Sequence, residues 1–285
     1  MPELPEVHAL AADLRERLRG HTVQRLEVLA FNALKTIDPT PQALVGATAV
    51  DVVRRGKFLD LRFGDIHLII HLSLAGWIRW RPDAPKPASS RSRKSPLAAR
   101  LMLEDGSGLD ITEAGTKKGL AIYLVRDPLE VPGVADLGPD ALELDRARFA
   151  AILKDAGKVR IKTVLRRQSL VAGIGNAYSD EILHAARMSP FHPADMSDDD
   201  VSELYTAMRQ TLLDAVERAS GHTASELKKE KKSALAVHGR FGEPCPVCGD
   251  TIQQVVYSDS SFQYCPTCQT GGKKLSDRGM DRLLK

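Results

Sequence analysis

Residues 245–268 read CPVCGDTIQQVVYSDSSFQYCPTC, and this stretch decides how the C-terminal part of the chain folds. Two Cys-x-x-Cys pairs stand 16 residues apart, a spacing typical of a four-cysteine zinc ribbon. The segment between them predicts a hairpin. Residues 241–285 are too few to build a hydrophobic core without a bound metal ion or another cross-link. We therefore predict one structural zinc ion, held by Cys245, Cys248, Cys265 and Cys268.

A pair of redox-active dithiols is the alternative interpretation of these cysteines. Four thiolates that leave no coordination position open favour a structural over a catalytic metal. Four cysteines could form two disulfides in a secreted chain, but here all four fall in this one segment, and in a reducing compartment that pattern indicates a metal site. Zinc ribbons occur in DNA-binding, protein-binding and purely structural modules, so the ribbon alone does not choose a function.

Upstream of the ribbon, the pattern is helical. Asp145 is placed to cap one helix, residues 159–168 predict a basic helix and residues 176–187 another. Ser197 and Asp200 form a capping-box pattern before a long helix that ends near residue 219. This block is predicted to be an all-helical domain.

The N-terminal part has a different texture. Residues 6–19 place apolar side chains at helical spacing and predict an amphipathic helix. Short Val/Ile/Leu-rich runs with apolar-polar alternation follow over residues 21–126, which favours an antiparallel sandwich or barrel. Residues 82–96 are rich in Pro, Ser and basic residues and predict a mobile loop. We place the domain boundaries at 1–130, 131–225 and 226–285.

Composition excludes two classes of protein. The net charge of +3 is too small for a polycationic nucleic-acid coat, so any DNA contact requires charge gathered on one face. No apolar run is long enough to span a membrane, and the N-terminus lacks the pattern of a signal peptide. We therefore predict a cytoplasmic, bacterial-type protein with no membrane partner.

The N-terminal motif Pro2-Glu3-Leu4-Pro5-Glu6-Val7 combines an imino acid with two carboxylates. Removal of Met1, expected before a small residue such as proline, would turn Pro2 into a secondary amine that can attack a sugar C1′ and form an iminium. The alternative is that Pro5 and Glu6 only begin the first helix, where proline and acidic residues are common.

Four motifs in order along the chain resemble the formamidopyrimidine-DNA glycosylase/endonuclease VIII family: the PELPEV start, RRGK at 54–57, VAGIGNAYSDEIL at 171–183 and HGRFGEPC at 238–245. Leu4 and Val7 resemble the formamidopyrimidine branch. The resemblance implies a multidomain α+β fold, with an N-terminal helix on an antiparallel β-sandwich, a helix-two-turn-helix domain and a zinc ribbon. It also implies a DNA glycosylase with abasic-site lyase activity.

The resemblance assigns roles residue by residue. Pro2 matches the nucleophile, Glu3 the general acid and Glu6 a second carboxylate of the pocket. Lys57 matches a lysine that contacts phosphate and supports β-elimination. Gly175 and Asn176 match a phosphate-binding turn, although Asn176 could also be only a helix N-cap. Arg240 belongs to the HGR motif and is a further candidate for DNA contact.

Three positions depart from the family pattern. Leu74 stands where a methionine wedge is common. Thr116-Lys117-Lys118-Gly119 replaces RRFG, so Lys117 and Lys118 are the candidate cations of that loop. Ser260 replaces the hairpin arginine that grips the phosphate of the flipped nucleotide, and a hydroxyl cannot replace an arginine fork. The sequence thus predicts weakened δ-elimination, an altered lesion preference, or an enzyme confined to some other damaged substrate. Residues 221–237, where the family places a loop over the base, have no diagnostic motif.

Two functional hypotheses follow. The first is a monomeric bifunctional glycosylase and lyase, with zinc as cofactor and double-stranded DNA carrying a damaged base or abasic site as partner. The second is a catalytically attenuated damaged-DNA-binding protein, favoured by Ser260 and residues 116–118. A zinc-ribbon transcription protein explains only residues 241–285.

Overall fold

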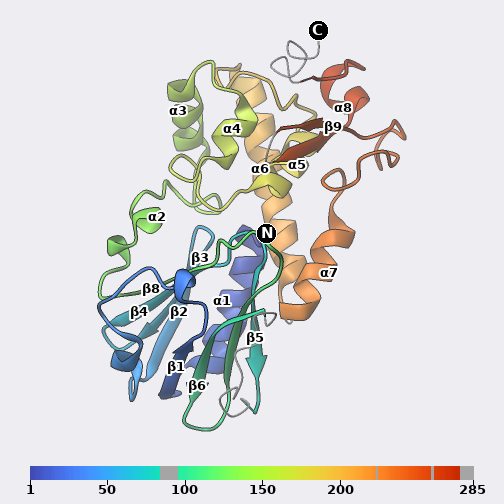
Figure 1. Cartoon of the computed structure of the whole chain (residues 1–285). Coiled ribbons are helices and arrows are strands. Elements are labelled where there is room, and N and C mark those ends of the chain that lie inside the picture. Colours follow the sequence, from blue (N-terminus) through green and yellow to red (C-terminus); the bar gives the residue numbers. More distant parts are fainter. Residues whose placement is uncertain (84–95, 223, 258–259, 277–285) are drawn as a thin grey trace. The chain divides into compact units, whose positions relative to one another are not determined.

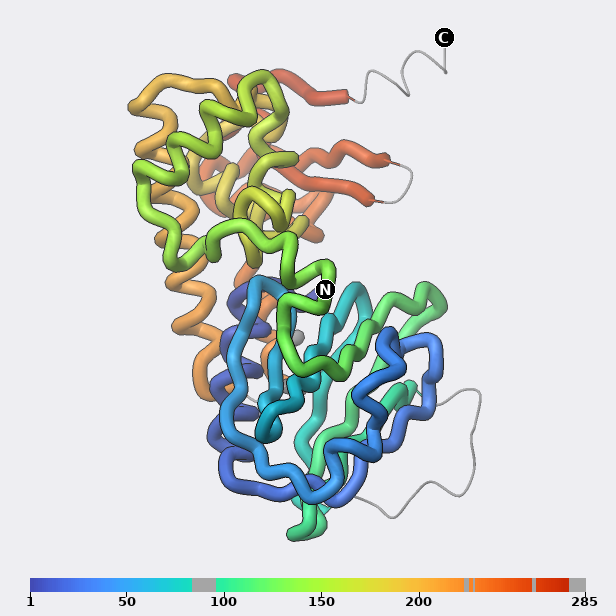
Figure 2. Tube along the Cα trace, turned by 90° about the vertical axis from the view of Figure 1, so that its left-hand side faces the viewer, coloured from blue at the N-terminus to red at the C-terminus, as the bar shows by residue number. Residues whose placement is uncertain are grey.

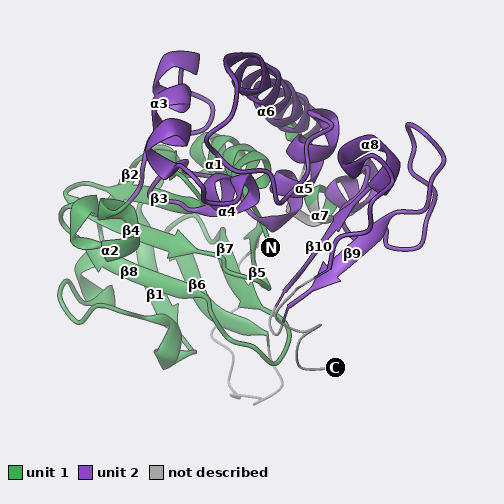
Figure 3. Cartoon of the chain, turned by 90° about the horizontal axis from the view of Figure 1, so that it is seen from above, with its two compact units in different colours: residues 1–136, 219–228 green, residues 137–218, 229–285 purple. Residues whose placement is uncertain are grey.

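The computed structural model describes residues 1–83, 96–222, 224–257 and 260–276 (Figure 1). The chain forms two compact units, one from Met1–Asp136 with Ala219–Lys228, the other from Leu137–Arg218 with Lys229–Lys285 (Figure 3). The boundaries 1–130, 131–225 and 226–285 stay a prediction. Most of the loop expected at 82–96 lies outside the described residues.

The first unit begins with α1 (Leu4–Leu18), which Pro5 and Glu6 start and which Gly20, with a φ of 83°, follows. Two four-stranded antiparallel sheets come next, in the orders β2-β3-β4-β8 and β1-β6-β7-β5. Their strands are β1 (Val23–Val28), β2 (Ala49–Arg55), β3 (Phe58–Phe63), β4 (Ile66–His71), β5 (Gly76–Arg81), β6 (Leu97–Leu103), β7 (Gly108–Glu113) and β8 (Ala121–Val125). The expected helix on an antiparallel β-sandwich is therefore confirmed.

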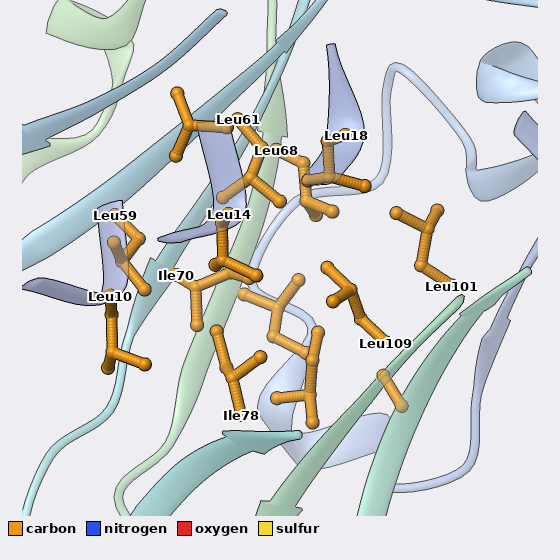
Figure 4. Packing of buried hydrophobic residues seen from close by; sticks show 14 of the residues in the cluster. Leu10, Leu14, Leu18, Leu59, Leu61, Leu68, Ile70, Ile78, Leu101 and Leu109 are labelled. Atoms are coloured by element: carbon orange, nitrogen blue, oxygen red, sulfur yellow. The ribbon is translucent and has the colours of Figure 1, made fainter. Parts of the chain in front are cut away.

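Short helical turns complete this unit: η1 (Phe31–Ala33), η2 (Pro41–Leu44), η3 (Pro128–Glu130) and α2 (Pro132–Ala135). The core lies between α1 and the inner faces of both sheets (Figure 4). Alternate residues of β3, namely Leu59, Leu61 and Phe63, are fully buried there, as the two-residue period of a strand requires. Each such side chain contributes roughly 1.5–3 kcal/mol by leaving water.

The second unit contains the helices expected from their capping residues. Asp145 accepts a hydrogen bond from Arg148 N at 2.8 Å and starts α3 (Arg146–Ala156). Ser197 accepts from Asp200 N at 3.2 Å before α6 (Asp198–Ala219). The two predicted helices between them are shorter than expected, as α4 (Ile161–Arg166) and α5 (Asn176–Ala185).

One sequence-based expectation and one alternative interpretation are wrong. Residues 221–237 are not a loop, because most of them form α7 (Ala224–Ala234), whose Leu227 is fully buried in the apolar core of the first unit. Asn176 is not the N-cap of α5, because Gly175 holds that position with extended backbone angles and Asn176 is the first helical residue.

The ribbon consists of β9 (Gln253–Val256), β10 (Ser261–Tyr264) and the short α8 (Pro266–Thr270). The strands pair antiparallel and form the predicted hairpin, whose two arms run side by side in Figure 2. Of the described helices, none has both the length and the apolar character that a membrane crossing requires.

Candidate active site and metal centre

The start of α1 holds the N-terminal motif. Pro2 is buried, and the side chains of Glu3 and Glu6 belong to residues only 2% exposed each. Glu3 is the N-cap residue, and its backbone N–H donates to Glu6 Oε2 at 2.8 Å. Glu6 therefore stabilises the helix start, which is the structural alternative considered for it, and this role does not prevent a second one in a reaction.

Lys57 lies in the two-residue turn between β2 and β3, which closes at the Arg55–Phe58 pair. Gly56 makes the turn possible, since its φ of 56° is unfavourable for residues with a side chain. Helix α1 packs against both of these strands. The turn thus places a half-buried lysine at one end of the β2–β3 hairpin.

His71, at the end of β4, is a site residue that the motifs did not single out. Its ring packs 4.6 Å from the ring of Phe58, the residue after Lys57. Burial, assisted by the positive charge of Lys57, lowers the pKa of His71 to about 4. The imidazole is therefore neutral at pH 7 and offers a polar group beside the lysine without adding a charge.

Leu74 projects from the loop between β4 and β5 and is 59% exposed. This loop lies against the loop that carries Thr116, Lys117 and Lys118. Ala114 N donates to Ala75 O at 3.3 Å, and a Cβ on Gly119 would lie 2.5 Å from Ser73 Oγ. The structure thereby joins the candidate wedge and the candidate cations, which the sequence had presented as separate motifs.

Glu113, also missed by the motifs, holds the second loop in shape. Its Oε1 accepts hydrogen bonds from Gly119 N at 2.7 Å and Leu120 N at 2.8 Å. Both lysines are exposed, and Lys118 Nζ donates to the backbone oxygen of the same glutamate at 2.7 Å. The carboxylate is buried, and it fixes the backbone that presents both lysines.

In the second unit, Gly175 and Asn176 begin α5. The preceding turn is closed by the Gln168 side chain, which donates to Ile174 O at 2.7 Å and accepts from Gly173 N at 3.0 Å. Asn176 Nδ2 donates to Ser261 O at 2.7 Å, so the helix start is joined to β10. Asn176 Oδ1 is buried without a hydrogen-bond partner in the described part of the chain.

Two buried carboxylates of α5 organise the entry to the ribbon. Asp180 accepts from Lys162 Nζ at 2.5 Å and contacts His238 Nδ1 at 2.6 Å. Glu181 accepts from the backbone N–H groups of residues 236, 237 and 238 at 2.6, 3.0 and 2.8 Å. Burial raises the pKa of Glu181, and these three donors oppose that effect. The HGR motif is thus held by α5.

Arg240, the candidate DNA-binding residue of that motif, is half-buried, and its Nη1 donates to Leu235 O at 3.3 Å. Its Nε lies 2.8 Å from Glu243 Oε2, and a surface ion pair of this kind stabilises a protein by about 0–1 kcal/mol. The guanidinium can therefore exchange this partner for another anion at little cost.

The four cysteine sulfurs converge, all within 4.8 Å of one another. Cys245 and Cys268 are 3.9 Å apart, and Cys248 and Cys265 are 3.4 Å apart. Tetrahedral zinc with Zn–S bonds of about 2.3 Å places its sulfurs about 3.8 Å apart, so the cluster fits the ion. Burial raises the pKa of the Cys268 thiol to about 11, so a bound cation is needed to hold it as thiolate near neutral pH.

Family models match three parts of the chain. Residues 1–114 match the formamidopyrimidine-DNA glycosylase N-terminal domain, and residues 137–227 match the formamidopyrimidine-DNA glycosylase H2TH domain. Residues 242–271 match a zinc finger found in FPG and IleRS. This match and the sulfur cluster together identify one structural zinc site.

Two relatives match this chain over different lengths. The formamidopyrimidine-DNA glycosylase of Symbiobacterium thermophilum is 35% identical over 94% of this chain and 89% of its own length. An uncharacterized formamidopyrimidine-DNA glycosylase-like protein of Mycobacterium tuberculosis is 57% identical over 52% of this chain and 94% of its own length.

Solved structures of Fpg and MutM have a similar fold. Lactococcus lactis Fpg in complex with abasic-site DNA has a TM-score of 0.81 and 25% identity, over 94% of this chain and 99% of that one. MutM in complex with DNA containing carbocyclic 8-oxo-G has a TM-score of 0.81 and 26% identity, over 94% and 100%.

Proposed function

Because the chain belongs to the formamidopyrimidine-DNA glycosylase family, we propose that it is a base-excision-repair DNA glycosylase with abasic-site lyase activity. Its substrate is double-stranded DNA with a damaged base or an abasic site, the kind of DNA bound by its structural relatives. The observation that carries this proposal is the start of α1, where Pro2 precedes the two buried carboxylates of Glu3 and Glu6.

The reaction begins at Pro2. Removal of Met1 frees its imino nitrogen, which attacks C1′ of the damaged nucleotide while the glycosidic bond breaks and the base leaves with the bonding electrons. Glu3, as general acid, donates a proton to O4′ while the C1′–O4′ bond breaks, and the nitrogen, having lost its own proton, forms an iminium with C1′. Glu6 holds the helix start that orients both residues. The resulting iminium acidifies C2′, whose proton is lost as the 3′-phosphate leaves in β-elimination.

Lys57 contacts the DNA backbone and supports this elimination. Its neighbour His71 stays neutral at neutral pH and adds no charge beside the lysine. Leu74 enters the gap left by the extruded base, and the adjacent Lys117 and Lys118 contact phosphate. In the second unit, Gly175, Asn176 and Arg240 contact the backbone.

A catalytically attenuated damage-binding protein is the second candidate. It is supported by Ser260, which lies in a hairpin that has no Lys or Arg between Cys248 and Cys265. We expect this difference to weaken δ-elimination, the step that expels the 5′-phosphate. Pro2, Glu3 and Lys57 are all present, and they favour the enzyme.

Borohydride trapping distinguishes the two candidates. The protein is incubated with duplexes that carry an abasic site or an oxidised purine, and borohydride reduces any iminium to a stable protein–DNA adduct. The enzyme gives an adduct whose yield Pro2→Gly lowers strongly without loss of duplex binding, because the primary amine that remains at position 2 is no longer held by the proline ring. Duplex binding by the wild type without any adduct supports the damage-binding protein, and an adduct undiminished in Pro2→Gly contradicts the role of Pro2.

Zinc completes the proposed machinery as a structural ion, held by four thiolates that leave no position for substrate. We further propose that the protein acts as a monomer in the cytoplasm, associated with the nucleoid. Sedimentation of the protein alone and with one abasic duplex tests the stoichiometry.

A further inference from the structure

The hairpin β9–β10 lacks positive charge, and another element of the same unit supplies it. Between Cys248 and Cys265 the sequence contains Asp250 and Asp259 but no Lys, Arg or His. A hairpin of this charge gains nothing by approaching a DNA backbone, which carries one negative charge per phosphate. A positive side chain that binds phosphate beside this hairpin therefore has to come from another element.

Arg160, the residue before α4, is that cation. Its Nη1 donates to the hydroxyl of Tyr257 at 3.4 Å, directly after β9. Its guanidinium lies 4.0 Å from the ring centroid of Phe191. That ring in turn packs edge-on against Phe262 of β10, with centroids 5.6 Å apart. The guanidinium thus stacks on the ring of Phe191, which itself packs against an aromatic side chain of the hairpin.

The backbone of Arg160 is fixed as well. Arg160 forms a bridge with Pro193, and Ile161 N donates to His192 O at 2.8 Å. The backbone oxygen of Arg160 accepts from Thr163 N at 2.9 Å. Anchoring at both ends of the side chain lowers the entropy that a long, flexible arginine loses when it binds.

The polar edge of this guanidinium remains available. Arg160 is exposed, and it forms no ion pair with any carboxylate of the described residues. Its hydrogen bond to Tyr257 is long and uses one of the five N–H donors of a guanidinium. Stacking on a ring occupies the flat face and leaves the edge for a bidentate contact with an anion. Exposed Lys158 adds a second positive charge nearby in the chain.

We infer that Arg160 binds a backbone phosphate of the DNA beside the hairpin, so that the helical part of the unit supplies the cation that the ribbon lacks. This inference rests on the proposed function, because it assumes that the hairpin approaches a duplex. Tyr257 and Phe191 act as positioning residues, which hold the guanidinium without contacting DNA themselves.

The test is the salt dependence of binding to a duplex with a tetrahydrofuran abasic analogue. Arg160→Gln is expected to weaken binding about tenfold and to lower the slope of log Kd against log salt by about one. Arg160→Lys keeps the charge but loses the fork, so it keeps the slope and gives an intermediate affinity. Arg148→Gln, an exposed arginine of α3, is the matched control and is expected to change neither quantity.

A methylphosphonate scan locates the contact. Neutralising phosphates one at a time weakens the wild type at several linkages, and Arg160→Gln is expected to be insensitive at one of them. Circular dichroism and zinc content report whether each variant is folded. If Arg160→Gln does not fold, the scan with Arg160→Lys decides, since a smaller penalty is then expected at that same linkage.

Three outcomes overturn the inference: an unchanged affinity and slope in Arg160→Gln, an equal loss in Arg148→Gln, or a variant that is as sensitive as the wild type at every linkage. The proposed function fails in a different way, because the wild type would then neither bind the abasic duplex nor form a borohydride adduct.

Discussion

Glu6 accepts a hydrogen bond from the backbone N–H of Glu3 at 2.8 Å, so two neighbouring buried carboxylates have different tasks. Both side chains take part in the capping box at the first turn of α1, and Glu3 is in addition proposed to donate a proton to the substrate. Mutation can separate the two roles, because the stability of the first unit reports the role in the helix start and base excision reports the role in catalysis.

We expect Glu3→Gln to abolish base excision with a small change in stability, and Glu6→Ala to lower the stability of the first unit by about 1 kcal/mol. The melting temperature of that unit would fall by about 2–4 °C. Both tryptophans, Trp77 and Trp80, lie in β5, so their fluorescence reports this unit. Equal destabilisation by both variants would contradict the division.

His71 predicts a pH dependence of stability. Its pKa is lowered from 6.5 to about 4 in the folded chain, so between these values the unfolded chain binds a proton that the folded chain does not. Stability therefore falls as pH falls, by about 2 kcal/mol between pH 7 and pH 5 from this residue. Tryptophan-monitored urea unfolding at both pH values measures the change, and His71→Gln should reduce it. The same pH dependence in the variant would show another group to be responsible.

Glu113 is expected to maintain the loop that presents Lys117 and Lys118. Glu113→Ala removes the acceptor of two backbone N–H groups and should destabilise the first unit by about 1–3 kcal/mol. Trypsin should then cut after Lys117 and Lys118 faster than in the wild type, as followed by mass spectrometry. Glu104→Ala, at an exposed glutamate after β6, serves as the control and should leave cleavage unchanged.

Leu74 tests the proposed extrusion of the base. Since it is 59% exposed, Leu74→Ala should change stability by less than about 0.5 kcal/mol. Excision from an intact duplex should fall at least about tenfold, because the gap is no longer filled and extrusion costs a few kcal/mol. Trapping on a single-stranded abasic substrate, where no base is extruded, should be unaffected. Equal losses on both substrates would contradict a wedge.

Removal of zinc should act on one unit. The sulfur cluster predicts one zinc per chain by elemental analysis, and Cys245→Ser should lower this content. Duplex binding should then be lost, since β10 joins the start of α5 through the Asn176–Ser261 hydrogen bond. The tryptophan melting curve of the first unit should stay the same, and a large shift there would contradict a local role for the metal.

Some features could be predicted from sequence because they depend on residues close together in the chain. The cysteine spacing indicated the zinc site, Asp145 and Ser197 indicated helix starts, and alternation indicated the strands. The prediction of a loop at residues 221–237 was wrong, because the local pattern there is polar and lysine-rich. That pattern gave no sign that Leu227 is buried in the core of the first unit.

The sequence by itself determined the family, the zinc ligands and the order of the elements, since caps, turns and metal-ligand spacings are written in local residue patterns. Only the tertiary structure placed Arg160 against Tyr257, 97 residues later, and Asp180 against His238, 58 residues later. Such contacts depend on how the helices and the hairpin pack. A charged side chain interacts with whichever group lies near it in space, and the residues around it in the sequence do not show which group that is.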